Sequence, residues 1–326
     1  MVKVAFFQTH KYELEYFTKA SDEAGVEISF LEPRLTSQTA VMSKGYDVVC
    51  SFANDSVDRD TLVALKNNGI KLLALRSAGF NHVDMQAAVE LEIPVVRVPS
   101  YSPHSIAEHA VCLLLALSRR IHKAHMRTQS HNFSLDGLVG FNLHGKKVGV
   151  IGTGKIGAVF ANIMKGFGSE VMAYDIDQNE EFNYVSLDKI LKESDIISLH
   201  VPLNPKTHHI LNRESFKKMK KGVYIINTSR GGLIDTKALI DSLKSEHIAG
   251  AGLDVYEEEE NLFFQDLSEE ILMDDLFARL ISFPNVLVTS HQAFLTSEAL
   301  NQIAVVTMEN IKTYFSTGEM PNQVLP

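Results

Sequence analysis

The stretch VGVIGTGKIG, from Val148 to Gly157, decides the fold of this chain. Its apolar first half suits a buried strand, and its glycines follow at the spacing G-x-G-x-x-G, which is typical of a turn into a helix. Such a turn needs glycine for three reasons: a tight bend, a backbone that can touch a pyrophosphate, and close packing of helix on strand. The three glycines are Gly152, Gly154 and Gly157. The start of the helix offers unpaired N–H groups to the phosphates.

A second predicted strand, from Glu170 to Tyr174, follows that helix and ends at Asp175. Asp175 lies 175 − 157 = 18 residues beyond the last glycine, where a dinucleotide site needs a carboxylate for the ribose hydroxyls. Strand, glycine turn, helix, strand and acid together predict a Rossmann domain that binds NAD. The carboxylate favours NAD over NADP because it repels a 2′-phosphate.

Strands and helices alternate along the rest of the chain, which predicts an α/β protein with two doubly wound parallel-sheet domains. The length of 326 residues agrees with two domains. One long helix is expected from Ser102-Pro103 to about His125, and the last helix spans residues 297–315. These helices cross between the domains. We therefore expect a flavodoxin-like substrate domain of residues 1–100 plus 299–326, an NAD-binding domain of residues 101–298, and a cleft between them.

Composition narrows the possible partners. The net charge of −9 argues against nucleic acid as the main partner. The longest apolar helix candidate, residues 106–117, is too short to cross a membrane. Cys50 and Cys112 lie in apolar runs without a C-x-x-C pair, so we expect reduced core cysteines in a cytoplasmic protein.

Further strands of the second domain are predicted at residues 196–199, 223–227, 249–253 and 286–288. Three polar residues follow these strands, at the edge where ligands of open α/β sheets bind. The guanidinium of Arg230 matches a carboxylate, although a surface arginine capping a loop fits the sequence equally well. Glu259 lies in a run of four glutamates, Glu257 to Glu260, among which spacing alone cannot choose. His291 is a side chain suited to proton exchange near neutral pH.

No metal site is predicted. The chain has 13 histidines, and none is arranged as H-E-x-x-H. His208 and His209 are neighbours in the chain, which is expected to put their side chains on unlike faces of a strand or helix.

The segments GTGKIG, NTSRGGLID, LDVYEEEE and SHQAFLT resemble the D-isomer-specific 2-hydroxyacid dehydrogenase family, and the resemblance covers essentially the whole chain. Within the family, four further segments are similar to the fermentative D-lactate dehydrogenases. They are ALRSAGFNHVD (74–84), VRVPSYSP (96–103), NLFFQD (261–266) and HQAFLTSEAL (291–300).

The resemblance implies a function and a set of site residues. Arg230 would bind the carboxylate of a small 2-keto acid such as pyruvate, His291 would donate the proton, and Glu259 would pair with His291. The other implied substrate residues are Ser77, Ala78, Gly79, Tyr101 and Phe294. The implied cofactor residues beyond the glycines and Asp175 are Lys155, Ile156, Val201, Pro202, Asn212, Thr228, Ser229 and Asp254. A homo-oligomer of two or four chains is also expected.

Two alternatives stay open at this point. Another D-2-hydroxyacid dehydrogenase, acting on a branched-chain or aromatic 2-keto acid, would share every catalytic residue. A non-catalytic NAD-sensing protein of the co-repressor kind could keep the same fold. Turnover of pyruvate with NADH separates the last alternative from the enzymes.

Overall fold

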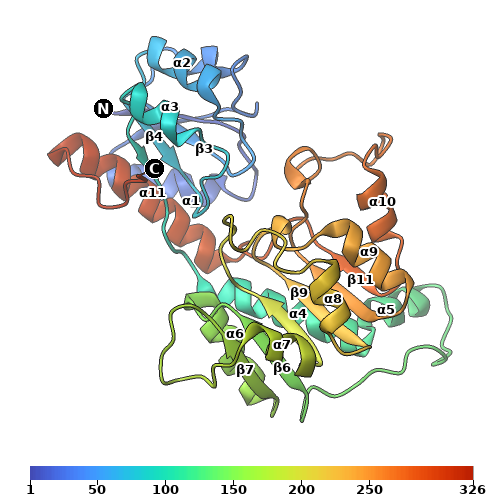
Figure 1. Cartoon of the computed structure of the whole chain (residues 1–326). Helices are drawn as coiled ribbons and strands as arrows, with labels where there is room; N and C mark the ends of the chain where they lie inside the picture. Colours follow the sequence, from blue (N-terminus) through green and yellow to red (C-terminus); the bar gives the residue numbers. More distant parts are fainter. Residues whose placement is uncertain (326) are drawn as a thin grey trace. The chain divides into compact units, whose positions relative to one another are not determined.

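The structure is a computed structural model that describes residues 1–325, and the chain divides into two compact units. Unit 1 contains Met1–Ser102 together with the segment from Leu295 to the C-terminal end, and unit 2 contains Pro103–Phe294. Pro326, the last residue of the predicted first domain, lies outside the described residues. Figure 1 shows the elements of both units in sequence colours.

Unit 1 is built on a five-stranded parallel sheet with the strand order β2-β1-β3-β4-β5. This is the 2-1-3-4-5 order of flavodoxin-like domains, as expected from the sequence. Its elements are β1 (Lys3–Phe6), α1 (Leu14–Ala24), β2 (Glu27–Phe30), η1 (Ala40–Ser43), β3 (Val48–Ser51), α2 (Arg59–Asn67), β4 (Leu72–Leu75), α3 (Met85–Glu90), β5 (Val95–Val96) and α11 (Ser297–Thr317).

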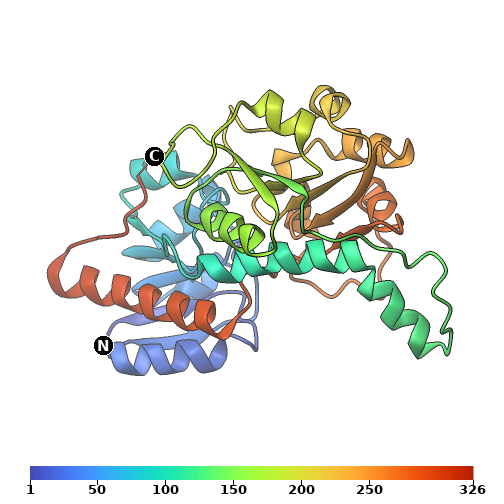
Figure 2. The same ribbon diagram turned by 90° about the horizontal axis from the view of Figure 1, so that it is seen from below.

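The central strands of this sheet are buried because helices cover both faces. β3 and β4 read VVCS and LLAL and are buried along their whole length, as parallel strands between two helical layers are. α2 and α3 share one apolar core with the sheet. α1 and α11 lie side by side, as Figure 2 shows, and Phe6 of β1 packs edge-on against Phe17 of α1. The last helix of the chain therefore belongs to the first unit.

Unit 2 contains a six-stranded parallel sheet in the order β11-β10-β9-β8-β6-β7. An isolated parallel bridge from Ala173 to Tyr184 continues the sheet beyond β7. Counted from that bridge, the order is the 3-2-1-4-5-6 of dinucleotide-binding sheets with one strand added, so the predicted Rossmann domain is confirmed. The order reverses between β6 and β8, which is where such sheets bind their ligands.

The elements of unit 2 begin with two helices. They are α4 (Pro103–Arg119), α5 (Ile121–Gln129), β6 (Lys147–Ile151), α6 (Lys155–Gly166), β7 (Glu170–Tyr174), α7 (Leu187–Glu193), β8 (Ile196–Leu199), α8 (Arg213–Lys218), β9 (Val223–Asn227), η2 (Gly231–Leu233), α9 (Thr236–Lys244), β10 (Ile248–Leu253), η3 (Glu259–Asn261), α10 (Asp275–Ile281) and β11 (Val286–Val288).

The single helix expected from residue 103 to about 125 is wrong. α4 ends at Arg119, Arg120 takes the left-handed conformation with φ of 51°, and α5 leaves in a new direction, as Figure 2 shows. The cause is a tertiary contact, because the carbonyl of Ser118 accepts a hydrogen bond from the N–H of Phe141 at 3.2 Å. α4 packs on α6 and the sheet, whereas α5 buries no residue, so nothing holds the two helices in line.

The two cysteines lie in different surroundings. Cys50 is buried on β3, and burial raises the pKa of its thiol to about 12. Cys112 is exposed, so the expectation that it belongs to the core is wrong. The apolar run around Cys112 forms a helix, and its neighbours Val111 and Leu113 occupy the buried side of that helix. Within residues 1–325, no helix combines the length and apolar character needed to cross a membrane.

Candidate active site

The glycine turn after β6 has the backbone that the sequence predicts. Gly152 has φ of 96°, and a Cβ there would lie 2.7 Å from the carbonyl carbon of His200. A Cβ at Gly157 would lie 1.9 Å from the carbonyl oxygen of Gly152. Gly154 caps α6, and the space where its Cβ would stand holds no atom within 4 Å. The first and third glycines are thus required by packing, and the second leaves the helix N-terminus open to phosphate groups.

His200 lies directly beneath this turn at the end of β8. It is half-buried, and burial lowers the pKa of its imidazole to about 3. One ring nitrogen shares a hydrogen bond of 2.8 Å with the hydroxyl of Ser198. A neutral imidazole therefore supports the glycine turn from below.

Asp175 follows β7 and points its carboxylate back at the turn. It accepts hydrogen bonds from the N–H of Thr153 at 2.6 Å and from the N–H of Asp177 at 3.1 Å. Burial alone would raise the pKa of Asp175, but the hydrogen bonds from Thr153, Asp177 and Ile176 outweigh it, so the pKa lies below its ordinary value. The carboxylate is therefore ionised at neutral pH, as a group that binds ribose hydroxyls and repels a 2′-phosphate must be.

Four predicted cofactor residues follow the neighbouring strands β8 and β9. Val201 and Pro202 come after β8, and the hydroxyl of Ser229 donates to the carbonyl of Val201 at 2.7 Å. Thr228 is buried, and its Oγ1 has no hydrogen-bond partner within residues 1–325. Buried hydroxyls are seldom left unsatisfied. An orphaned hydroxyl directly after β9, at the end of a strand in the sheet that carries the glycine turn, therefore fits a bound dinucleotide.

Three other predicted cofactor residues lie at helix starts. Lys155 and Ile156 begin α6, directly after the open position at Gly154. Asn212 is the N-cap of α8, and its side chain accepts the N–H groups of Glu214 and Ser215 at 3.0 and 3.2 Å. A local structural role therefore accounts for Asn212, and its contact with the cofactor stays a prediction.

His291 and Glu259 form a close pair. His291 Nδ1 lies 2.6 Å from Glu259 Oε1, and the second oxygen, Oε2, accepts the N–H of Tyr256 at 2.8 Å. The two side chains are 25% and 24% exposed, so solvent reaches the pair but does not surround it. With Nδ1 turned to the carboxylate, the opposite nitrogen, Nε2, is left for a substrate. Of the four glutamates in the run, Glu259 is the one that the structure brings to the histidine.

The loop that carries His291 is held by Asp254. His291 has φ of 54°, and its N–H donates to the carbonyl of Asp254 at 2.7 Å. The Asp254 carboxylate is fully buried and accepts the hydroxyl of Thr289 at 2.5 Å and the N–H groups of Gln292 and Ala293 at 2.9 and 2.8 Å. Asp254 therefore fixes the backbone around the imidazole. Its predicted place near the nicotinamide stays a prediction.

Arg230 follows β9 and is half-buried. Its Nη1 donates to the carbonyl of Ser229 at 2.6 Å, and its own carbonyl accepts from the side chain of Asn227 at 2.8 Å. A Cβ on the next residue, Gly231, would lie 2.0 Å from the carbonyl carbon of Tyr256. The segment of Arg230 thus touches the segment that ends in Glu259.

The predicted substrate loop of unit 1, residues 77–79, is also fixed by hydrogen bonds. Ser77 Oγ donates to the carbonyl of Gly79 at 2.8 Å, and Arg97 Nη1 donates to the carbonyl of Ala78 at 2.7 Å. In a trans peptide the carbonyl and the following N–H point in opposite directions. Arg97 therefore sets the direction of the Gly79 N–H. Sequence reasoning missed Arg97, although it stands in the quoted segment VRVPSYSP.

Arg97 is itself held by the C-terminal part of the chain. The side chain of Asn310 donates to the carbonyl of Arg97 at 2.9 Å, and the N–H of Arg97 donates to the carbonyl of Asn322 at 3.1 Å. The side chains of Asn322 and Asn310 meet at 2.8 Å. The two remaining predicted substrate residues are half-buried, Tyr101 in unit 1 and Phe294 in unit 2.

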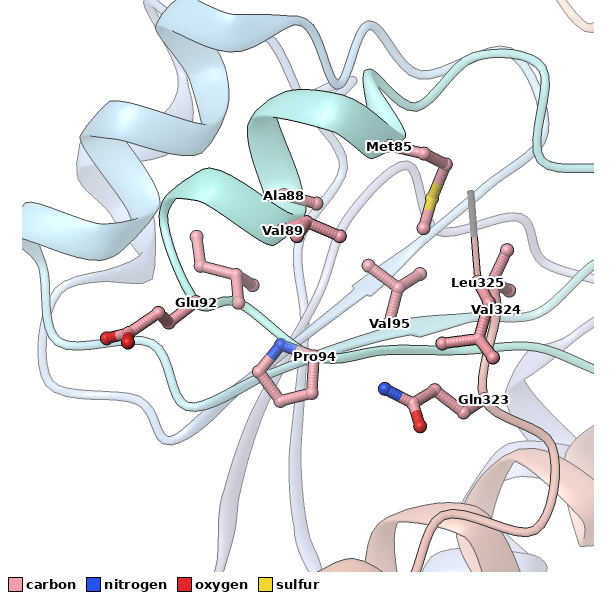
Figure 3. A pocket seen from close by; sticks show the side chains of 10 residues that line it. Met85, Ala88, Val89, Glu92, Pro94, Val95, Gln323, Val324 and Leu325 are labelled. Atoms are coloured by element: carbon pink, nitrogen blue, oxygen red, sulfur yellow. The ribbon is translucent and has the colours of Figure 1, made fainter.

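Unit 1 also has a surface pocket of about 350 Å³ between α3, β5 and the C-terminal segment. Figure 3 shows its mostly apolar lining, with Met85 and Val89 on one side and Val324 on the other. The lining includes the carboxylate of Glu92 and no cation, and none of the predicted site residues belongs to it. A 2-keto acid needs a cation or N–H groups for its own carboxylate. This pocket is therefore not the substrate site.

A histidine paired with a carboxylate at the edge of a dinucleotide-binding sheet is equipped for proton transfer next to a hydride carrier, which defines a nicotinamide-dependent dehydrogenase. The family model described as "D-isomer specific 2-hydroxyacid dehydrogenase, NAD binding domain" matches residues 111–293. The chain belongs to this family and contains its NAD-binding domain, so the resemblance seen in the sequence is confirmed.

Individual proteins agree with this assignment over the full length. A 2-hydroxyacid dehydrogenase homolog of Haemophilus influenzae is 49% identical over 100% of both chains. The D-lactate dehydrogenase of Escherichia coli is 46% identical over 99% of this chain and 100% of its own. The solved structure of the pyruvate reductase of Chlamydomonas reinhardtii has a TM-score of 0.94 and 45% identity, covering 99% of this chain and 98% of that one.

Proposed function

We propose that the protein is an NAD-dependent D-lactate dehydrogenase that reduces pyruvate to D-lactate. The contact of 2.6 Å between His291 Nδ1 and Glu259 Oε1 is the observation that carries the proposal. The full-length similarity to proteins named D-lactate dehydrogenase and pyruvate reductase supports pyruvate as the substrate.

The pair of His291 and Glu259 transfers the proton. NADH, when bound, supplies the hydride to the carbonyl carbon of the keto acid. His291, protonated on both ring nitrogens, gives its Nε2 proton to the carbonyl oxygen. Glu259 accepts the Nδ1–H throughout, which stabilises the imidazolium and keeps Nε2 directed away from itself. In the reverse reaction the neutral imidazole, still protonated on Nδ1, takes the proton of the hydroxyl group.

Arg230 binds the substrate carboxylate. A guanidinium carries five N–H donors, and one of its nitrogens, Nη1, is engaged with the carbonyl of Ser229. The others can bind a carboxylate in a bidentate manner and reduce the negative charge that grows on the carbonyl oxygen. The proposed further substrate contacts are those of Ser77, Ala78, Gly79, Tyr101 and Phe294.

A turnover assay with NADH over a panel of 2-keto acids tests the proposal. Pyruvate should have the highest kcat/KM, and chiral analysis should identify the product as D-lactate. One added methylene changes discrimination by about 1–3 kcal/mol, so 2-ketobutyrate should be slower but still used. Preference for phenylpyruvate or a branched-chain keto acid would point to another member of the family. NADH binding without turnover of any keto acid would point to an NAD-sensing protein.

The proposal includes a cytoplasmic homo-oligomer of two or four chains. Cys50 and Cys112 form no disulfide in the structure, which suits a reducing compartment. Between residues 121 and 139, five large apolar side chains are each at least 59% exposed. They are Ile121, Met126, Phe133, Leu135 and Val139. Several large exposed apolar side chains within one short segment favour contact with another protein. Light scattering should give a mass of at least two chains, and the double variant Phe133→Glu, Leu135→Glu should lower it. A monomeric mass for the unaltered protein would contradict this part of the proposal.

A further inference from the structure

His208 and His209 lie on the same side of the chain, contrary to the expectation from their adjacency. Their rings stack with centroids 3.9 Å apart and planes 24° apart. The reason is the backbone of His209, whose φ of 50° lies in the left-handed region that a non-glycine residue seldom adopts. Glu257 reaches the same place from the segment after β10. One ligand atom from each of the three residues lies within 4.8 Å of the other two.

Two of the three side chains are already held in position. Glu257 Oε1 contacts His209 Nε2 at 2.5 Å, and Glu257 Oε2 accepts the hydroxyl of Thr236 at 3.0 Å. The N–H of His209 donates to the carbonyl of Gly232 at 2.9 Å. Hydrogen bonds behind the ligating atoms, such as that from Thr236, orient ligands and strengthen metal binding.

We propose that this cluster binds a transition-metal dication such as Zn²⁺, with His208, His209 and Glu257 as ligands and a fourth position open to water. Two imidazoles and one carboxylate are a ligand set that Zn²⁺ uses at open sites. Imidazole also suits Cu²⁺ and Ni²⁺, whereas Mg²⁺ and Ca²⁺ require oxygen ligands. The cluster therefore favours Zn²⁺, Cu²⁺ and Ni²⁺ over Mg²⁺ and Ca²⁺.

Only small movements are needed to form the site. Ligands at about 2.1 Å from a tetrahedral metal lie about 3.4 Å from each other, so the present separation, which is within 4.8 Å, must close by up to about 1.4 Å. His208 is exposed, and its side chain can rotate to close that distance. Metal binding replaces the hydrogen bond between His209 and Glu257. The Nε2 lone pair of His209 then faces the ion, and the ring keeps its proton on Nδ1.

The site adjoins the segments of Arg230 and Glu259. A Cβ at Gly231, the residue after Arg230, would lie 2.4 Å from the backbone nitrogen of Glu257. Glu257 is two residues before Glu259, the partner of His291. A bound ion would thus link the loop after β8 to both segments. Because an ion bound to the folded protein stabilises it, occupancy should raise Tm.

Titration of the metal-stripped, untagged protein tests the site. Calorimetry should show one Zn²⁺ per chain, Tm should rise with Zn²⁺, and Co²⁺ should produce the visible absorption bands of a four-coordinate site. His208→Asn and Glu257→Gln should each weaken Zn²⁺ binding at least about tenfold, as loss of a direct ligand should exceed loss of the groups behind it. The matched control is His125→Asn, which removes an exposed histidine of α5 and should bind Zn²⁺ like the unaltered protein.

Each variant is first checked for NADH binding by fluorescence, which reports whether unit 2 is folded. If Glu257→Gln fails this check, His208→Asn carries the test, because the side chain of His208 is exposed. Zn²⁺ binding that is equal in the unaltered protein and in His208→Asn would mean adventitious surface binding and would overturn the proposal. Absence of one-to-one binding tighter than about 100 μM, or about 5.5 kcal/mol, would overturn it as well. None of these readouts depends on which keto acid the enzyme uses.

Discussion

Replacing Glu259 by Gln should impair both directions of the reaction, because both oxygens of Glu259 act as acceptors. Oε1 faces Nδ1 of His291, and Oε2 accepts the N–H of Tyr256. A glutamine has one acceptor atom and one NH₂ group, so it cannot serve both donors. If its oxygen stays with Tyr256, its NH₂ group faces Nδ1 and excludes a proton there. If its oxygen turns to His291, two donors oppose each other at Tyr256.

The proton on Nδ1 matters in both directions. Reduction needs the imidazolium, and oxidation needs a neutral ring whose proton is on Nδ1 and whose Nε2 is unprotonated. Losing one hydrogen bond to a charged group costs about 1.5–3 kcal/mol. A contact of 2.6 Å between side chains that are three-quarters buried supports a value within that range. We therefore expect kcat/KM to fall by roughly 10- to 150-fold for pyruvate reduction and for D-lactate oxidation.

Steady-state kinetics in both directions measure this effect, with Glu258→Gln as the matched control. Glu258 is an exposed neighbour whose side chain makes no cap hydrogen bond. Substitutions at such surface positions have small effects, so kcat/KM of Glu258→Gln should stay within about twofold of the value for the unaltered enzyme. A Glu259→Gln enzyme within twofold of the unaltered one in both directions would refute the pairing. A loss confined to reduction would show that the carboxylate acts through its charge and does not fix the proton on Nδ1.

Three further predictions concern the substrate, the cofactor and pH. Arg230→Lys keeps the charge but loses the planar fork, so KM for pyruvate should rise at least about tenfold with an unchanged Kd for NADH; an unaltered KM would remove Arg230 from the site. Asp175→Ala should raise the NADPH to NADH ratio of kcat/KM at least about tenfold, and a constant ratio would contradict its role. The free energy of unfolding, measured with urea, should be lower at pH 5 than at pH 7. Burial lowers the pKa of His82 to about 4 and that of His200 to about 3. Below about pH 6.5 these two histidines therefore bind protons in the unfolded chain but not in the folded protein. Each histidine lowers the free energy of unfolding by about 1.4 kcal/mol per pH unit in that range. Equal stability at the two pH values would contradict this.

The sheets could be predicted because their signals are local. The strands expected at 196–199, 223–227 and 286–288 are β8, β9 and β11 to the residue. The glycine turn is equally predictable, since contacts within the motif or with the adjacent strand end require Gly152 and Gly157, and Gly154 leaves the start of the helix open. Which of the four glutamates, Glu257 to Glu260, belongs to the site does not follow from a local signal. Their spacing gave no preference, and the family resemblance singled out Glu259. In the structure Glu257 meets His209 and Glu259 meets His291.

The expectations that failed depend on contacts between distant residues. The break at Arg120 follows from a hydrogen bond between Phe141 and Ser118, which no helix pattern contains. The stacking of His208 on His209 requires a left-handed residue. Arg97 acts on a loop 19 residues earlier in the chain, so its role could not be read from its own segment.

The hold of Asn322 on Arg97 has a practical consequence for handling the enzyme. Asn322 lies near the C-terminal end, beyond α11, and the N–H of Val324 completes the attachment by donating to Val95 at 2.9 Å. Proteolytic loss of the residues beyond α11 would remove the acceptor of the Arg97 N–H and would leave Arg97, and with it the peptide of Ala78, held by Asn310 with one contact fewer. A preparation clipped there would still bind NADH through unit 2 and would pass as intact on a gel. Intact mass spectrometry is therefore the appropriate quality control before any KM is compared.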